Sequence, residues 1–228
     1  YSSNTSLTTW AANDWFAIGE NMTGLKAFGS QGLTLHSENG IHLLTPTQNA
    51  SIPYRRRSKS AKGTVSNRSI VTIAAPGVPQ MQLFVREDGI YRFTGGEAEK
   101  ISWKLDGDRF WNDVNTDNIK NSFAVENTTR NEVWFFLPVN ATKNNKIVVF
   151  NYLFNTWYGP HAEASSLYGT WNCGATIDNV AHAGGYNNSG RLYKMDDTSE
   201  LDDDDGSATA AVDAAFTTGA PPPLGADV

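Results

Sequence analysis

The sequence predicts an all-β fold, a β-propeller or propeller-like array of about four to five antiparallel blades. Its 228 residues include 20 Gly and nine Pro, which indicates many short elements joined by turns. Four segments alternate apolar and polar residues on both sides of a turn, the pattern of a β-hairpin. The second arms of these hairpins begin after residues 40, 89, about 146 and 190, so one unit recurs about every 50 residues. This period is typical of propeller blades, and a β-sandwich with similar hairpins is the alternative fold.

The first two hairpins have the strongest local signals. Gly32–Leu44 turns at Asn39-Gly40, and Met81–Phe93 turns at Asp88-Gly89. Asn-Gly and Asp-Gly favour tight two-residue turns between antiparallel strands, because these residues accept positive φ angles. Each segment therefore predicts two paired strands.

The other two hairpins are less regular. Glu132–Phe136 and Lys146–Tyr152 form one pair across a polar loop at residues 140–145, and His182–Met195 forms the other with Ser189-Gly190 near its turn. Large aromatic side chains supply much of the contact area between packed elements. We expect the core between blades to include Trp134, Phe135, Phe136, Tyr152 and Trp157.

The chain divides into two expected parts. Residues 1–206 form the propeller-like domain, and residues 207–228 form a strand followed by a stiff arm containing Pro221-Pro222-Pro223, which leads into a further part. The chain begins with Tyr1 rather than Met, so we expect it to be a piece of a longer protein. No apolar run approaches the roughly 20 residues that cross a bilayer, so no membrane span is predicted.

Charge is segregated along the chain, whose formal net charge is -6. This balance argues against a surface built throughout to hold nucleic acid. No acidic residue lies between Glu38 and Glu87. Within this stretch we expect an exposed loop, either solvated or in contact with another subunit, that carries Arg55, Arg56, Arg57, Lys59 and Lys62. Near the C-terminus the balance inverts in a run that contains Asp202, Asp203, Asp204 and Asp205.

The sequence predicts no catalytic, cofactor or metal site. Cys173 is the single cysteine, which excludes an internal disulfide, and we expect it to be a small buried apolar residue. His36 and His42 flank one turn and, from their even separation, are expected in a structural role on one sheet face. The acidic run fails the EF-hand pattern, because Leu201 and Val212 would fill its first and last ligand positions, although a looser Ca²⁺ site stays open.

Several segments together resemble a family of bacteriophage virion proteins. Ser122–Tyr158 ends in VVFNYLFNTWY, similar to the v-v-y-N-y-x-x-N-x-W stretch of that family, and Leu83–Ser102 is similar to its D-G-I-Y-x-F-x-G…I-S segment. Ile18–Pro46 resembles the preceding blade, and Asp203–Thr217 resembles a following acidic turn and strand. The family comprises tail nozzle, tail hub and packaged-DNA stabilisation proteins of short-tailed phages, which contain β-propellers. The resemblance spans about residues 14 to 217.

The resemblance implies a structural component of a phage tail in the virion, with no enzymatic activity and no cofactor. It implies a ring of copies around the DNA exit channel, in contact with other tail or portal-adaptor proteins. Double-stranded DNA would pass through transiently, because an acidic lining, here Asp202–Asp205, repels the phosphate backbone. The basic residues 55–62 would then meet an acidic surface on a neighbouring subunit.

Two other functions stay open. The Asn-Thr-Trp157 ending and the Gly184-Gly185 pair are also kelch-like, which makes a propeller that binds a carbohydrate or a protein the runner-up. Exposed tryptophan on a ring face would favour that function. A glycoside-acting enzyme is the weakest of the three, since such chemistry needs two carboxylates in one pocket. Its only support is a set of carboxylates near Trp103 and Trp111, namely Asp106, Asp108, Asp113 and Asp117.

Overall fold

The computed structural model describes residues 19–49, 54–105, 109–162, 170–185 and 192–195. In these ranges the chain is all-β, with four antiparallel sheets and only short helices. None of the helices in these ranges is long and apolar enough to cross a membrane. The expected arm at residues 207–228 lies outside the described residues.

Each sheet is built from consecutive strands in chain order. The first sheet contains β1 (Met22–Ala27), β2 (Leu33–Ser37), β3 (Ile41–Pro46) and β4 (Tyr54–Ser60). The second contains β5 (Val71–Ile73), β6 (Met81–Arg86), β7 (Gly89–Phe93) and β8 (Glu99–Lys100). The third contains β9 (Phe123–Asn127), β10 (Glu132–Leu137), β11 (Lys146–Asn151) and β12 (Thr156–Ala162). The fourth contains β13 (Trp171–Ile177), β14 (Val180–Gly185) and β15 (Leu192–Lys194).

The short helices lie in the connections between strands. They are α1 (Arg109–Asn112) and the 3-10 turns η1 (Gly29–Gln31), η2 (Asn67–Ser69), η3 (Ser102–Lys104) and η5 (Ile119–Asn121). Their shortness agrees with a sequence in which turn formers separate every apolar segment.

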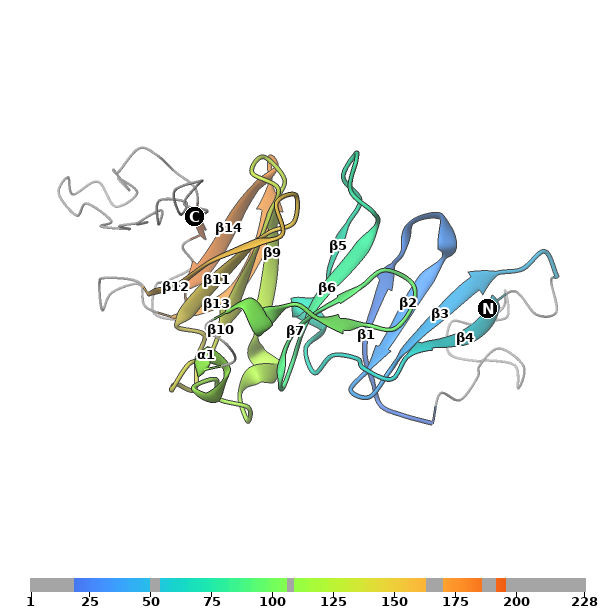
Figure 1. Cartoon of the computed structure of the whole chain (residues 1–228), viewed down its shortest axis with the longest axis horizontal. Helices are drawn as coiled ribbons and strands as arrows, with labels where there is room; N and C mark the ends of the chain where they lie inside the picture. The colour runs from blue at the N-terminus through green and yellow to red at the C-terminus, as the bar shows by residue number, and fades with distance from the viewer. Residues whose placement is uncertain (1–18, 50–53, 106–108, 163–169, 186–191, 196–228) are drawn as a thin grey trace, which may run out of the picture.

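The repeat predicted from the sequence is the repeat of the fold. The third strands β3, β7, β11 and β15 begin at residues 41, 89, 146 and 192. The first sheet lies at one side of the molecule and the second beside it, and the third and fourth sheets overlap at the other side (Figure 1). The first strands of successive sheets are neighbours, since β9 contacts both β5 and β13. Inner strands that adjoin one another are the arrangement of propeller blades, so the fold is a propeller-like array.

Three apolar cores separate the four sheets, where a two-layer sandwich would have one. The core between the first and second sheets contains Phe28, Ile41, Leu43, Ile70, Phe84, Tyr91, Phe93 and Ala98. The core between the second and third is the largest and includes Leu83, Val85, Ile90, Val133, Phe135, Leu137, Val148 and Phe150. The core between the third and fourth contains Phe123, Val125, Trp134, Phe136, Ile147, Val149, Trp171, Ala181 and Ala183.

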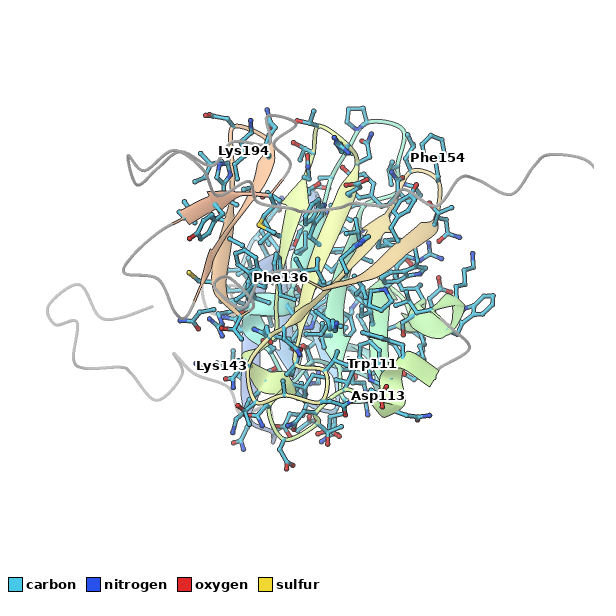
Figure 2. The ribbon with its side chains drawn as sticks, turned by 90° about the vertical axis from the view of Figure 1, so that its left-hand side faces the viewer. Trp111, Asp113, Phe136, Lys143, Phe154 and Lys194 are labelled. Atoms are coloured by element: carbon cyan, nitrogen blue, oxygen red, sulfur yellow. The ribbon has the colours of Figure 1, made fainter. Side chains whose placement is uncertain are left out.

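Strand β10 shows how alternation divides one strand between two cores. Phe135 points toward the second sheet, and its neighbours Trp134 and Phe136 point toward the fourth. Phe136 stacks on Phe123 with ring centroids 4.3 Å apart, and it lies between the strands of the third and fourth sheets (Figure 2). The sequence prediction that these aromatics form the core between blades is confirmed. The two remaining members fit as well, because Tyr152 is buried and Trp157 packs against the largest core.

Polar side chains connect neighbouring sheets at their edges. The amide oxygen of Gln82 on β6 accepts hydrogen bonds from Thr34 Oγ1 and from His36 Nε2 on β2, each 3.0 Å long. On η2, Arg68 donates to the carbonyl oxygens of Asn121 and Asn172 at 2.9 and 2.6 Å. These bonds tie the first sheet to the second, and η2 to the third and fourth.

One expected loop is a strand. Residues 55–57, with 59, belong to β4, which pairs with β3 through its backbone. A cationic sequence without apolar alternation fits here, because β4 is the outer edge of the first sheet and its charges discourage pairing with other chains.

Candidate functional site

Exposed large apolar side chains gather in three places on the described part of the chain. The outward face of the first sheet carries Met22, Leu25 and Tyr54, and the outward face of the fourth carries Ile177 and Leu192. The third place lies between the outer edges of the second and third sheets, at Trp103, Leu153 and Phe154. Contiguous exposed apolar surface of this kind commonly marks a contact or ligand site.

Strand register places the terminal patches on faces that no described sheet covers. In the fourth sheet, Ala181 and Ala183 pack on the third sheet, so the alternate residues, including Ile177 and Leu192, face the other way. In the first sheet, Ile41 and Leu43 face the second sheet. The exposed Leu25 is paired with Leu35, and both lie on the other face of the sheet, away from Ile41 and Leu43. Both ends of the array therefore carry apolar residues on their outward faces, where Leu25 and Ile177 are exposed and Leu35 and Leu44 are buried.

Cys173 corrects a sequence expectation. It is exposed rather than buried, because it lies on the outward face of β13 opposite Gly184. The small residues along this strand gave no alternation from which to assign a face. The thiol contributes to the outward face of the fourth sheet.

The expected subunit-contact residues divide between the two faces of β4. Arg55, Arg56 and Arg57 are all exposed, and their register places Arg56 beside Leu44 and Arg57 beside Leu43. Lys59 is half-buried. These four cations form one basic strip along the edge of the first sheet. Lys62 departs from this strip, because its ammonium lies over the ring of Tyr91, 5.3 Å from the centroid, on the second sheet.

His36 and His42 do not share a face, so that expectation is wrong. The tight turn pairs His36 with Ile41 and Leu35 with His42, which places the two imidazoles on opposite sides of the sheet. An even separation predicts a common face only within one strand. Across a hairpin the face of a residue depends on the pairing that the turn sets. Burial lowers the pKa of both side chains, and that of His36 to about 4. Neither imidazole belongs to a group of possible metal ligands among the described residues.

Glu126 and Tyr152 form a titratable pair at the side of the third sheet. Tyr152 Oη donates to Glu126 Oε1 at 3.2 Å. Burial raises the pKa of Glu126, and burial beside this carboxylate raises the pKa of Tyr152 to about 12. The phenol therefore stays protonated and holds the turn after β11 against β9.

A shallow pocket of about 180 Å³ lies between the outer edges of the second and third sheets. Its lining residues are Arg92, Glu99, Lys100, Ile101, Trp103, Lys104 and Asn155. The indole nitrogen of Trp157 donates to Ile101 O at 3.1 Å, which fixes one sheet edge against the other. The turn that carries Asn155 also carries Phe154, which projects outward from the molecule (Figure 2).

The polar groups of this pocket include more cations than carboxylates. Arg92 Nε donates to Glu99 Oε1 at 2.7 Å, and Arg92 Nη2 contacts the same oxygen. Lys104 Nζ lies 5.5 Å from the centroid of the Trp103 ring and 3.5 Å from Asn155 O. No carboxylate of the described residues forms an ion pair with Lys104.

The other sequence candidates are not assembled into a site. Asp113 and Asp117 are exposed, and the buried Trp111 donates its indole hydrogen to Glu87 O at 2.7 Å. Asp106, Asp108 and Asp202–Asp205 lie outside the described residues. Among the residues that are described, no cluster of three or more His, Cys, Asp or Glu could hold a metal ion.

Comparisons with known proteins show no family for this chain. No family model matches the sequence, and no curated protein matches it. The structure is similar to the extracellular domain of a hybrid two-component system from B. thetaiotaomicron, with 16% identity and a TM-score of 0.39. That match covers 85% of this chain and 24% of the other, so this chain spans about a quarter of its length. At this level the similarity bears on neither fold nor function.

Proposed function

We propose that the chain is a structural component of a bacteriophage virion, a tail nozzle or hub protein that assembles into a ring around the DNA exit channel. The observation that carries the proposal is the difference between the inner and outer sheets. The second and third sheets are packed on both faces, whereas the outward faces of the first and fourth expose Leu25 and Ile177. Terminal sheets of this kind are suited to contact with further sheets.

The occupant we propose for these faces is a second copy of the chain. A contact between the fourth sheet of one copy and the first sheet of the next is head-to-tail, and repeated head-to-tail contacts close into a ring when the rotation allows it. The basic strip of β4 lies at the edge of the first sheet, and we propose that it meets an acidic surface on the neighbouring copy. Complementary charge would set the register of the copies.

An acidic lining would suit passage of DNA better than binding of DNA. Neutralising phosphates requires Lys or Arg, and the chain has 24 acidic against 18 basic side chains. We therefore propose that Asp202–Asp205 face the channel. The partners would be further copies and other tail or portal-adaptor proteins.

The native mass tests assembly directly. We expect mass photometry and negative-stain images of the purified chain to show closed rings of many copies. A 24.9 kDa monomer at micromolar concentration would contradict self-assembly through the terminal faces.

Charge reversal tests the basic strip. We expect the R55E/R56E/R57E variant to remain folded and to lose ring formation, because like charges would then face one another. The matched control is K120E/R130E/K143E, which makes the same change in net charge on loops of the third sheet. Normal rings from the first variant, or equal loss from both, would remove the assigned role of β4.

A further inference from the structure

The pocket at the edge of the second and third sheets has no role in the proposed ring. Trp103 is 58% exposed and Phe154 is 69% exposed. Many other aromatic side chains of the described structure are buried in the three cores between the sheets. Exposure of two large rings a short distance from a pocket contributes little to folding stability. Their position is better explained by a ligand.

The shape of the pocket favours a single ring-sized unit. Its volume of about 180 Å³ is below that of sites for drug-sized ligands, and it opens to solvent. Its lining includes the buried Ile101 and the exposed indole of Trp103. A pyranose ring presents C–H groups on its face that stack on an indole, whose face is electron-rich.

The polar wall suits hydroxyl groups. Both contacts from Arg92 reach Oε1 of Glu99, so Oε2 accepts no hydrogen bond from the described residues. This oxygen is an acceptor for a sugar hydroxyl, and the side-chain amide of Asn155 can both donate and accept.

The charge of the pocket favours an acidic ligand. Arg92, Lys100 and Lys104 line it with only one carboxylate, Glu99, among the described residues. The ammonium of Lys104 faces a ring and a carbonyl rather than a carboxylate. A ligand carboxylate would gain a charge-assisted hydrogen bond there.

We propose that this pocket binds an acidic saccharide, a uronic acid unit of a longer chain. Trp103 stacks on the sugar ring, Lys104 receives its carboxylate, and Glu99 and Asn155 bind its hydroxyls. Leu153 and Phe154 on the adjoining turn extend the surface along the saccharide. This site is separate from the terminal faces, so it does not depend on ring formation.

Calorimetric titration of the purified chain with a galacturonate tetrasaccharide tests the proposal. We expect saturable binding, at least roughly tenfold weaker binding of the neutral maltotetraose, and at least a tenfold loss in the W103A variant. K104Q should reduce affinity for the acidic probe and leave binding of the neutral one unchanged. Tyr54→Ala removes another exposed aromatic, from the first sheet, and should change nothing.

Several results would overturn the proposal. They are no binding at millimolar saccharide, full binding by W103A, or equally tight binding of polyglutamate, which would show attraction to any polyanion. Equal affinity for an oligothymidylate that also depends on Trp103 would assign the pocket to single-stranded nucleic acid instead. Circular dichroism of each variant confirms that the fold is intact.

Discussion

The two central sheets and the two terminal sheets use the same strand order with different consequences. Strands β6 and β10 place large apolar residues on both faces, because each sheet has a neighbour on each side. Strand β13 in a terminal sheet directs Trp171 and Gly174 toward the third sheet and leaves Cys173 and Ile177 on the outward face. The fourth sheet therefore packs only one of its faces against another described sheet, and Ile177 on the other face stays exposed.

The comparison also separates stability from assembly. Burial of an apolar side chain contributes about 1.5–3 kcal/mol, and the residues between sheets gain it in a single copy. The exposed outward residues, such as Leu25 and Ile177, gain it only when another molecule covers them. Mutations in the two regions should therefore act on different measurements.

The largest effect is expected for Phe135, which is fully buried in the core between the second and third sheets. Phe135→Ala should lower the free energy of unfolding by about 3–5 kcal/mol, because it removes the ring and leaves a cavity. Ile177→Ala on the outward face of the fourth sheet should cost less than about 1 kcal/mol. Urea unfolding of both variants measures the difference, and equal losses would contradict the assignment of inner and outward faces.

The contact between the first and second sheets should depend on pH through His36. Burial lowers its pKa from 6.5 to about 4 in the folded chain, although the hydrogen bond to Gln82 raises the pKa by a smaller amount. Between pH 6.5 and pH 4 the unfolded chain binds a proton that the folded chain does not, so stability falls as the pH falls. The total loss is about 3 kcal/mol and is complete below pH 4.

The variant His36→Gln isolates this effect from the titration of carboxylates. It keeps a polar partner for Gln82 and removes the titrating group, so its stability should fall less than that of the wild type between pH 7 and pH 4. Urea unfolding at a series of pH values measures both curves. Parallel curves would show that His36 does not sense pH.

A smaller effect is expected at the contact between the third and fourth sheets. A Cβ at Gly174 would lie 2.5 Å from Val125 Cγ2 and 2.8 Å from both Phe123 Cε2 and the carbonyl oxygen of His182. Gly174→Ala should therefore cost about 1–3 kcal/mol through overpacking. Gly185→Ala in the same sheet meets its nearest atom at 3.4 Å and is the matched control. The midpoint of thermal unfolding measures both variants. Equal midpoints would show that the third and fourth sheets can move apart at Gly174 without loss of stability.

Much of the fold could be predicted because its signals are local. The turns at Asn39-Gly40 and Asp88-Gly89 and the aromatic strands β10 and β11 follow from neighbouring residues. Turn chemistry also marks β13 and β14, since Asp178 and Asn179 both have positive φ angles at their junction. The sequence prediction overlooked that signal, because Trp171–Ile177 is rich in small residues.

The candidate sites could not be predicted because they depend on contacts between distant segments. Lys104 and Asn155 line the same pocket, although they are 51 positions apart in the sequence. The basic stretch at residues 55–57 gives no alternation, and only the backbone pairing with β3 shows that it is a strand. Which sheet faces which is likewise decided by packing across the whole array.

The smallest effect on stability should accompany a large effect on assembly. Ile177 is 40% exposed and Leu192 is 47% exposed, so I177D/L192D should change the free energy of unfolding of a dilute, monomeric sample by less than about 0.5 kcal/mol. The same variant should lose ring formation in mass photometry, because two carboxylates would be buried at the contact between copies. The matched control T116D/T142D adds the same charge to exposed loops and should assemble normally.

At higher concentration the wild type should gain stability through association and the variant should not, since only a protein that binds its own folded copies is stabilised by mass action. A variant that loses stability in the dilute sample would place these residues in the fold itself, and rings formed by the variant would show that the outward face of the fourth sheet is not the contact.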